Sequence, residues 1–306
     1  MNDLRQLRHF VALAEHGHFA RAAEAVHLSQ PALSRSIQAL ESSLGCTLLN
    51  RHSRGISLTA HGELVLEHAR RLLAGSQALS NAVSQLGNLA SGEVRLGSGP
   101  YPAARLIPRA IGHFAERFPQ VRLQLTIDTW QQLRTRLLDN EIELFVADIR
   151  EFQDDPRLRV VALRSHPAVL FCHPQHPLLA RAMLSVKDLL GYPLAGTQLP
   201  QEVANALQRL SDGGTPLSIE CDNFMVLKAL VSTSHVLSMS PWDVIAQDVA
   251  DGRLAVLPLS DGALPQRSAY GLVSRAGHSL SPGAAELQRV ILEQDRHSEI
   301  PELPLF

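Results

Sequence analysis

The segment from Leu28 to Gly45 constrains the fold most, because its pattern predicts a helix with two different faces. Ser29 suits the N-cap of this helix, and Pro31 falls in the first turn, where the missing N–H of proline is tolerated. Gly45 is expected to end the helix. The apolar residues recur at helical spacing, namely Leu33, Ile37, Leu40 and Leu44. One face of the helix is therefore expected to be buried and the other exposed.

The flanking residues predict two shorter helices before this one and a hairpin after it. Apolar residues at helical spacing form a first helix that Gly17 ends, and the alanine-rich stretch Phe19–Val26 forms a second. Two short runs, 48–51 and 56–59, flank a polar turn next to Gly55 and predict a hairpin. Three helices followed by a hairpin, or wing, are the components of a winged helix-turn-helix.

The exposed face of the third helix carries small and polar side chains that suit DNA. In a helix-turn-helix the N-terminal part of this helix enters the major groove. Glutamine can read adenine and arginine can read guanine, each through paired hydrogen bonds, and the free N–H groups at a helix start suit a phosphate. The alternative is an ordinary amphipathic helix with a solvated face. The predicted DNA-binding residues are Ser29, Gln30, Pro31, Ser34, Arg35 and Gln38, with Arg51 and Arg54 in the wing.

The net charge alone argues against a nucleic-acid-binding protein. The chain has 28 basic and 30 acidic residues, which gives −2 at pH 7. Residues 1–62 hold six arginines and four acidic residues and carry +2, so the remainder carries −4. This asymmetry is weak, so the prediction of DNA binding depends on the helical pattern.

Residues 60–86 predict one long helix with a heptad repeat. His68 and Gly75 occupy the complementary positions of the repeat and weaken it. The helix either pairs with a second copy of the chain or lies against its own domain. The residues of the predicted dimerisation seam fall seven apart, at Val65, Leu72, Leu79 and Leu86.

After a small-residue hinge at 88–92, the pattern changes to alternating strands and helices. A first run predicts strands at Val94–Leu96, Val121–Ile127 and Ile142–Val146 and helices at Ala103–Phe118 and Trp130–Leu138. A second run predicts strands near 168–172, 193–195, 217–220, 236–239 and 254–257, helices near 201–210, 224–231 and 242–249, and a last helix at 282–294. Two α/β runs of similar order indicate two related lobes with a cleft between them.

Several motifs of the N-terminal domain resemble the DNA-binding domain of LysR-type transcriptional regulators. They run in order and without a gap as Phe10-Val11-Ala12-Leu13-Ala14-Glu15, Phe19-Ala20-Arg21-Ala22-Ala23, Leu28-Ser29-Gln30-Pro31-Ala32-Leu33-Ser34, Ile37-Gln38-Ala39-Leu40-Glu41, Leu44-Gly45, Arg51 and Leu58-Thr59-Ala60-His61-Gly62. His18 stands where the family usually has serine, and Leu49 where phenylalanine is common. Neither departure touches the reading face, so we expect them to alter packing rather than function.

The resemblance implies a sequence-specific regulator that binds double-stranded promoter DNA and is modulated by a small-molecule effector. It implies a homodimer on two half-sites, dimers that join as a homotetramer, and contact with RNA polymerase. An effector between the lobes would bias two arrangements of this assembly. The implied parts are a winged helix-turn-helix at 1–60, a dimerisation helix at 61–87, a hinge at 88–92 and a two-lobed α/β effector domain of the periplasmic-binding-protein type at 93–306, with lobe I at about 93–163 and 266–306 and lobe II at about 164–265.

Ligands of two-lobed α/β domains bind where strands end and helices begin at the cleft. Each of the polar residues there has a second interpretation, since Ser98 and Thr129 can be helix caps and Asp148 can be an ion-pair partner. Because an acidic residue opposes a carboxylate, an amine or a hydroxylated ligand is as plausible as an organic acid. The predicted effector-binding residues are Ser98, Gly99, Tyr101, Thr129, Asp148, Thr197, Gln198 and Asn223.

The sequence predicts neither catalysis nor a cofactor or metal. No phosphate-binding glycine loop, His-Glu-x-x-His or Cys-x-x-Cys motif is present, and the three cysteines are far apart. Cys172, His173 and His176 lie in a proline-rich loop without an evident fourth ligand. With no apolar run of membrane-spanning length and no signal peptide, we expect a cytoplasmic protein without a membrane partner. The alternative function, a solute-binding protein or enzyme on the same two-lobed fold, leaves residues 1–86 without a role.

Overall fold

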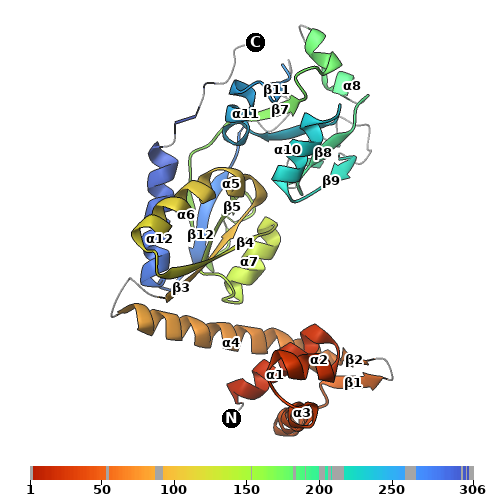
Figure 1. The fold of residues 1–306 in the computed structure, drawn as a ribbon, viewed down its shortest axis with the longest axis vertical. Helices are drawn as coiled ribbons and strands as arrows, with labels where there is room; N and C mark the ends of the chain where they lie inside the picture. Colours follow the sequence, from red (N-terminus) through yellow and green to blue (C-terminus); the bar gives the residue numbers. More distant parts are fainter. Residues whose placement is uncertain are drawn as a thin grey trace. The chain divides into compact units, whose positions relative to one another are not determined.

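A computed structural model describes residues 3–52, 55–86, 92–152, 154–181, 184–189, 191–199, 204–205, 208, 217–258, 267–297, 299–300 and 302. Two compact units divide the chain close to residue 83, and Figure 1 shows the elements of each. Arg54, most of the hinge at 88–92 and most of the helix predicted at 201–210 lie outside the described residues. Within the described part of the chain, no helix combines the length and apolar character needed to cross a membrane.

The first unit has the three helices and the hairpin that the sequence predicts. Gly17 and Gly45 both adopt the left-handed conformation, with φ of 68°, and end their helices as expected. Ser29 occupies the N-cap position of the third helix, but its side chain makes no capping hydrogen bond. The elements are α1 (Leu4–His16), α2 (Phe19–Ala25), α3 (Gln30–Leu44), β1 (Leu49–His52), β2 (Gly55–Leu58) and α4 (Ala60–Leu86).

The core of this unit forms where the apolar faces of α1 and α3 meet. Phe10, Leu13 and Leu33 are completely buried there. The wing is held against α1, because the Ile56 N–H donates to the carbonyl of Gly17 at 3.1 Å. The polar face of α3 is therefore left on the outside of a rigid domain.

The apolar side chains of α4 differ in burial along the helix. Val65 and Leu73 pack on the core of the unit, so its first half lies against its own domain. Leu72 and Leu79 are 53% and 67% exposed. Val65 therefore faces a different environment from Leu72 and Leu79, and the side chain of Leu86 is not described.

The second unit contains two five-stranded sheets, each with mixed strand directions. In the first sheet β3, β4 and β5 are parallel and β12 runs antiparallel between β5 and β6. The strands of this sheet are β4 (Val121–Ile127), β3 (Gly92–Ser98), β5 (Leu144–Asp148), β12 (Tyr270–Arg275) and β6 (Leu158–Ala162). The strands of the second sheet are β11 (Ala255–Val256), β7 (Ala168–Cys172), β10 (Leu237–Pro241), β8 (Leu194–Gly196) and β9 (Ile219–Glu220).

Helices cover these sheets and create the core of each lobe. In the first sheet, Leu106 and Leu287 pack with Leu96 on one face, whereas Leu133 packs with Phe145 on the other face. The helices are α5 (Pro100–Ala104), α6 (Leu106–Arg117), α7 (Trp130–Leu138), α8 (Val186–Leu189), α10 (Phe224–Ser232), α11 (Ala246–Ala250) and α12 (Pro282–His297), with 3-10 turns η1 (Pro177–Ala180) and η2 (Trp242–Val244).

Two sequence expectations for this unit are wrong in detail. The helix predicted at 103–118 is two helices, because the backbone breaks at Arg105 and Pro108 can occupy only a first turn. The helix predicted at 242–249 is likewise divided, into η2 and α11. The strands β6 and β12 were not predicted.

Two segments connect the lobes and lie side by side. Pro167 and Arg267 form an antiparallel bridge. Next to it the Ser268 N–H donates to the His166 carbonyl at 2.7 Å, and the His166 N–H donates to Ser268 Oγ at 2.9 Å. We call this double connection between the lobes the lobe crossover.

Candidate functional site

The predicted DNA-reading residues gather on the exposed face of α3. Ser29, Gln30, Pro31, Arg35 and Gln38 are exposed and Ser34 is half-buried. Among the described residues, the side chains of Gln30, Ser34, Arg35 and Gln38 make no hydrogen bond or ion pair, and their polar groups are available to a ligand. In the wing, the Arg51 side chain and the whole of Arg54 lie outside the part of the chain that the structure describes.

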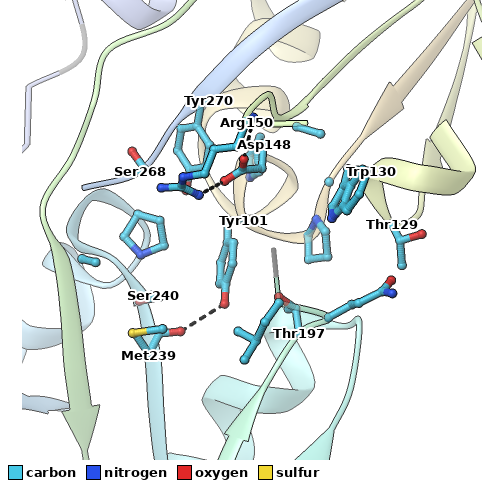
Figure 2. Close-up of a pocket in the computed structure, with 18 of the residues that line it drawn as sticks. Tyr101, Thr129, Trp130, Asp148, Arg150, Thr197, Met239, Ser240, Ser268 and Tyr270 are labelled. Carbon is cyan, nitrogen blue, oxygen red and sulfur yellow. Dashed lines mark hydrogen bonds and ion pairs between the residues drawn. The ribbon is translucent and has the colours of Figure 1, made fainter. Parts of the chain in front are cut away.

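A pocket in the second unit collects residues from both of its sheets (Figure 2). Six of the eight predicted effector residues line it: Gly99, Tyr101, Thr129, Asp148, Thr197 and Gln198. They lie together because parallel strands β3, β4, β5 and β8 all end there. The pocket therefore has the position that the strand-end rule predicts, while a ligand role for these residues stays a prediction.

Tyr101 stands in the middle of this pocket and connects the two lobes (Figure 2). Its hydroxyl donates to the carbonyl of Met239 on β10 at 3.0 Å, and its ring packs edge-on against Phe224 at 5.1 Å between centroids. Burial raises the pKa of the Tyr101 phenol, although a hydrogen bond with Thr197 opposes the rise. The phenol is thus a neutral donor that ties helix α5 to the second lobe.

Asp148 at the end of β5 is both a pocket residue and half of an ion pair. Its carboxylate accepts from the Arg150 guanidinium and from the Arg150 N–H. Burial raises the pKa of Asp148, and these contacts with Arg150 work against that rise. Since Arg150 also donates to the carbonyl of Arg267 at 2.6 Å, this pair is part of the pocket wall.

Two predicted effector residues are placed elsewhere. Ser98 is completely buried at the end of β3, and its hydroxyl donates to the Gly99 carbonyl. Asn223 caps α10, where its side chain accepts from the N–H groups of Met225 and Val226. Thr129 lines the pocket, and its side chain also accepts from the Gln132 N–H at 3.4 Å. Its position is therefore compatible with both interpretations, a pocket residue and a helix cap.

The structure adds pocket residues that were not predicted from the sequence. Trp130 and Arg150 could have been predicted, because they follow Thr129 and Asp148 closely in the chain. Tyr270 could not, because it lies on the unpredicted strand β12 and reaches the pocket only when that strand pairs with β5. The added residues with polar or aromatic side chains are Trp130, Arg150, Asp222, Ser240, Arg267, Ser268 and Tyr270.

Several buried charged groups lie near the lobe crossover. Asp243 is 4% exposed, and burial raises its pKa to about 6 even though Arg105 and Arg164 oppose the rise. Asp295 adds negative charge beside it. His166 shows the opposite effect, because burial and then Arg164 lower its pKa to about 4. In both cases burial therefore shifts the pKa in the direction that favours the neutral form.

Replacing Asp243 with asparagine is expected to stabilise the protein at alkaline pH. The raised pKa means that the stabilising contribution of protonated Asp243 is lost as pH rises from about 4 to 6, at a cost of about 3 kcal/mol above that range. Asp243→Asn should raise the free energy of unfolding by up to this amount at pH 8 and not at pH 4, as measured by urea denaturation. Asp251→Asn in an exposed ion pair should change it by less than about 1 kcal/mol at either pH. A variant less stable than wild type at pH 8 would contradict the expectation.

Neither the cysteines nor the histidines form a metal site within the described part of the chain. His176 is 2% exposed, and both of its ring nitrogens are engaged, with the Leu178 N–H and with the His235 carbonyl. Cys172 is completely buried, and burial raises the pKa of its thiol to about 12. These side chains are therefore core residues of the second lobe.

Two protein-family models match the chain, one for each unit. Residues 4–63 match the bacterial regulatory helix-turn-helix proteins of the lysR family, and residues 87–296 match the LysR substrate-binding domain. The chain is 67% identical over 297 residues to the "SDS degradation transcriptional activation protein" of Pseudomonas sp. (strain ATCC 19151), which covers 96% of this chain and 97% of that protein. These matches leave no support for the alternative of a solute-binding protein or an enzyme.

Solved structures with the same fold cover both units. One is CbnR, a LysR family transcriptional regulator, with a TM-score of 0.68 at 23% identity over 96% of this chain and 99% of that chain. Another is full-length CbnR complexed with its target DNA, with a TM-score of 0.67 at 24% identity over 96% of this chain and 100% of that chain. At this level of identity the likeness concerns the fold alone.

Proposed function

Because this chain belongs to the LysR family of transcriptional regulators, we propose that it activates genes for the degradation of alkyl sulfates. As a member of that family it is a DNA-binding transcriptional regulator with an effector-binding domain, and not an enzyme. The observation that carries the proposal is the 67% identity, over nearly the whole chain, to an activator named for the degradation of SDS, which is a C12 alkyl sulfate.

A gene deletion tests this proposal. In a strain that lacks this chain, dodecyl sulfate should no longer raise the transcripts of genes for dodecyl sulfate degradation. A plasmid copy of the wild-type chain should restore the response. Full induction in the deletion strain would contradict the proposed function.

The DNA contact is proposed to be made by α3. Gln30, Ser34, Arg35 and Gln38 present donors and acceptors on one exposed face, which can reach base edges in the major groove. Ser29 and Pro31 lie at the helix start, where backbone N–H groups suit a phosphate. Arg51 and Arg54 of the wing would contact the DNA backbone.

Replacing Arg35 with alanine should weaken specific DNA binding by about 1–3 kcal/mol, because a paired hydrogen bond to guanine would be lost. The measurement is binding to the DNA upstream of its own gene, competed with unrelated DNA at about 0.15 M salt. Arg122→Ala is the matched control, since Arg122 is an 80% exposed arginine of β4. An unchanged ratio of specific to non-specific affinity would remove Arg35 from the reading set.

The remaining parts of the proposal concern the assembly. Two copies would pair through α4, two dimers would join as a tetramer, and the assembly would contact RNA polymerase at the promoter. The effector would bind in the pocket beneath Tyr101, where contacts from both lobes allow it to favour one arrangement of the lobes over another. Since promoter DNA lies in the bacterial cytoplasm, the protein would act there.

A further inference from the structure

Two hydroxyl groups in the wall of the effector pocket lack a hydrogen-bond partner. Ser240 and Tyr270 are 2% and 5% exposed, and neither Ser240 Oγ nor the Tyr270 hydroxyl bonds to any described residue. In the view of Figure 2 both stand on the side of Tyr101 opposite to Thr129. Buried polar groups without partners are costly, so a ligand that supplies a partner gains affinity there.

The charged groups of the pocket are already engaged. Arg150 is paired with Asp148 and donates to a backbone carbonyl. Arg267 donates to the Ser165 hydroxyl at 3.2 Å and to the Ser165 carbonyl at 2.6 Å. An anion that recruited the Arg150 guanidinium would remove the ion-pair partner of the half-buried Asp148 carboxylate, at a cost.

Some N–H donors at the helix starts in and beside the pocket are also engaged. Thr129 accepts from an N–H group in the first turn of α7, and Asn223 accepts from two N–H groups at the start of α10. These are the donors that a sulfate would otherwise use. Most of the remaining wall is apolar, and includes Pro100, Pro102, Leu199, Met239 and Pro241.

We infer that the effector in this pocket is an uncharged primary alkyl alcohol, recognised through Ser240 and Tyr270, rather than an anionic alkyl sulfate. This inference rests on the proposed function. Hydrolysis of a primary alkyl sulfate by water gives a primary alcohol and hydrogen sulfate, so the regulator would sense the product of the first degradation step. An alcohol oxygen can both donate and accept a hydrogen bond, so it suits a hydroxyl partner such as Ser240 Oγ or the Tyr270 hydroxyl, whereas a sulfate ester only accepts.

The test is isothermal titration calorimetry of the full-length protein with 1-octanol and with octyl sulfate, which share a chain length. We expect 1-octanol to bind at least about tenfold more tightly than octyl sulfate. Ser240→Ala and Tyr270→Phe should each weaken octanol binding about three- to tenfold, the effect of one neutral hydrogen bond. Neither change should lower the Tm, because neither hydroxyl makes a bond in the free protein.

Ser238→Ala is the matched control for these variants. Ser238 lies two residues earlier on β10, is completely buried and also has an unpartnered hydroxyl, but it does not line the pocket. Its replacement should leave octanol binding unchanged.

Equal or tighter binding of octyl sulfate would overturn the inference, and so would the absence of binding by both ligands to a protein that still binds its promoter. A response to octanol that Ser238→Ala weakens as much as Ser240→Ala would also overturn the assigned contact. Each of these results leaves the proposed function intact. That function fails instead if the deletion strain keeps its normal induction by dodecyl sulfate.

Discussion

Replacing Gly62 with alanine is expected to destabilise the DNA-binding unit by about 3 kcal/mol or more. Gly62 lies in the first turn of α4, and a Cβ atom there would stand 2.1 Å from the carbonyl oxygen of Leu48. That oxygen belongs to the backbone and also accepts from the Thr59 N–H at 3.0 Å, so it cannot move independently. The helix and the base of the wing must therefore separate to admit one methyl group.

The measurement is hydrogen–deuterium exchange of the full-length variant, read in peptides that cover residues 4–58. Exchange there should accelerate strongly, and promoter binding should fall with it, while peptides from 92–152 should be unchanged. Gly75→Ala is the matched control in the same helix, because no atom lies within 4 Å of the added Cβ. It should stabilise α4 by up to about 1 kcal/mol through helix propensity. Similar exchange in the two variants would show that the close approach at Gly62 does not matter.

The first unit could be predicted almost completely from the sequence, because its signals are local. Helix ends at Gly17 and Gly45 depend on a single residue each, and the faces of α1 and α3 depend on a spacing of three or four residues. The close packing at Gly62 is different. The glycine is visible in the sequence, but its neighbour Leu48 is known only once the wing has folded.

The pocket could be predicted in part, because strand ends are local but side-chain direction and pairing are not. The strand-end rule selected Gly99 and Thr129, which line the pocket, yet it also selected Ser98, which alternation along β3 turns into the interior. Tyr270 could not be predicted as a pocket residue, because its strand β12 lies between β5 and β6 in the sheet but more than a hundred residues after them in the chain. Ser240 was missed because the predicted strand stopped at 239, one residue short.

Replacing both Leu72 and Leu79 with glutamate is expected to convert the proposed dimer to monomers. The two side chains are exposed and lie about 20° apart around the helix, on a different side from Leu66 and Leu73, which pack on the core of their own unit. In a paired helix each would be buried against its copy, where unpaired carboxylates are costly. Sedimentation equilibrium of the full-length variant should give the monomer mass, and affinity for a promoter with two half-sites should fall at least about 100-fold, because the second contact is no longer intramolecular.

Ser80→Glu provides the control for that double variant, because Ser80 is exposed on another side of the same helix, where its hydroxyl donates to the Ser76 carbonyl. This replacement adds a charge to α4 on a side away from Leu72 and Leu79, so the proposed dimer and its DNA affinity should persist. A dimer that survives both leucine replacements would show that these leucines are not the seam. Dissociation with unchanged promoter affinity would contradict the second half of the argument, since a single α3 would then suffice for binding.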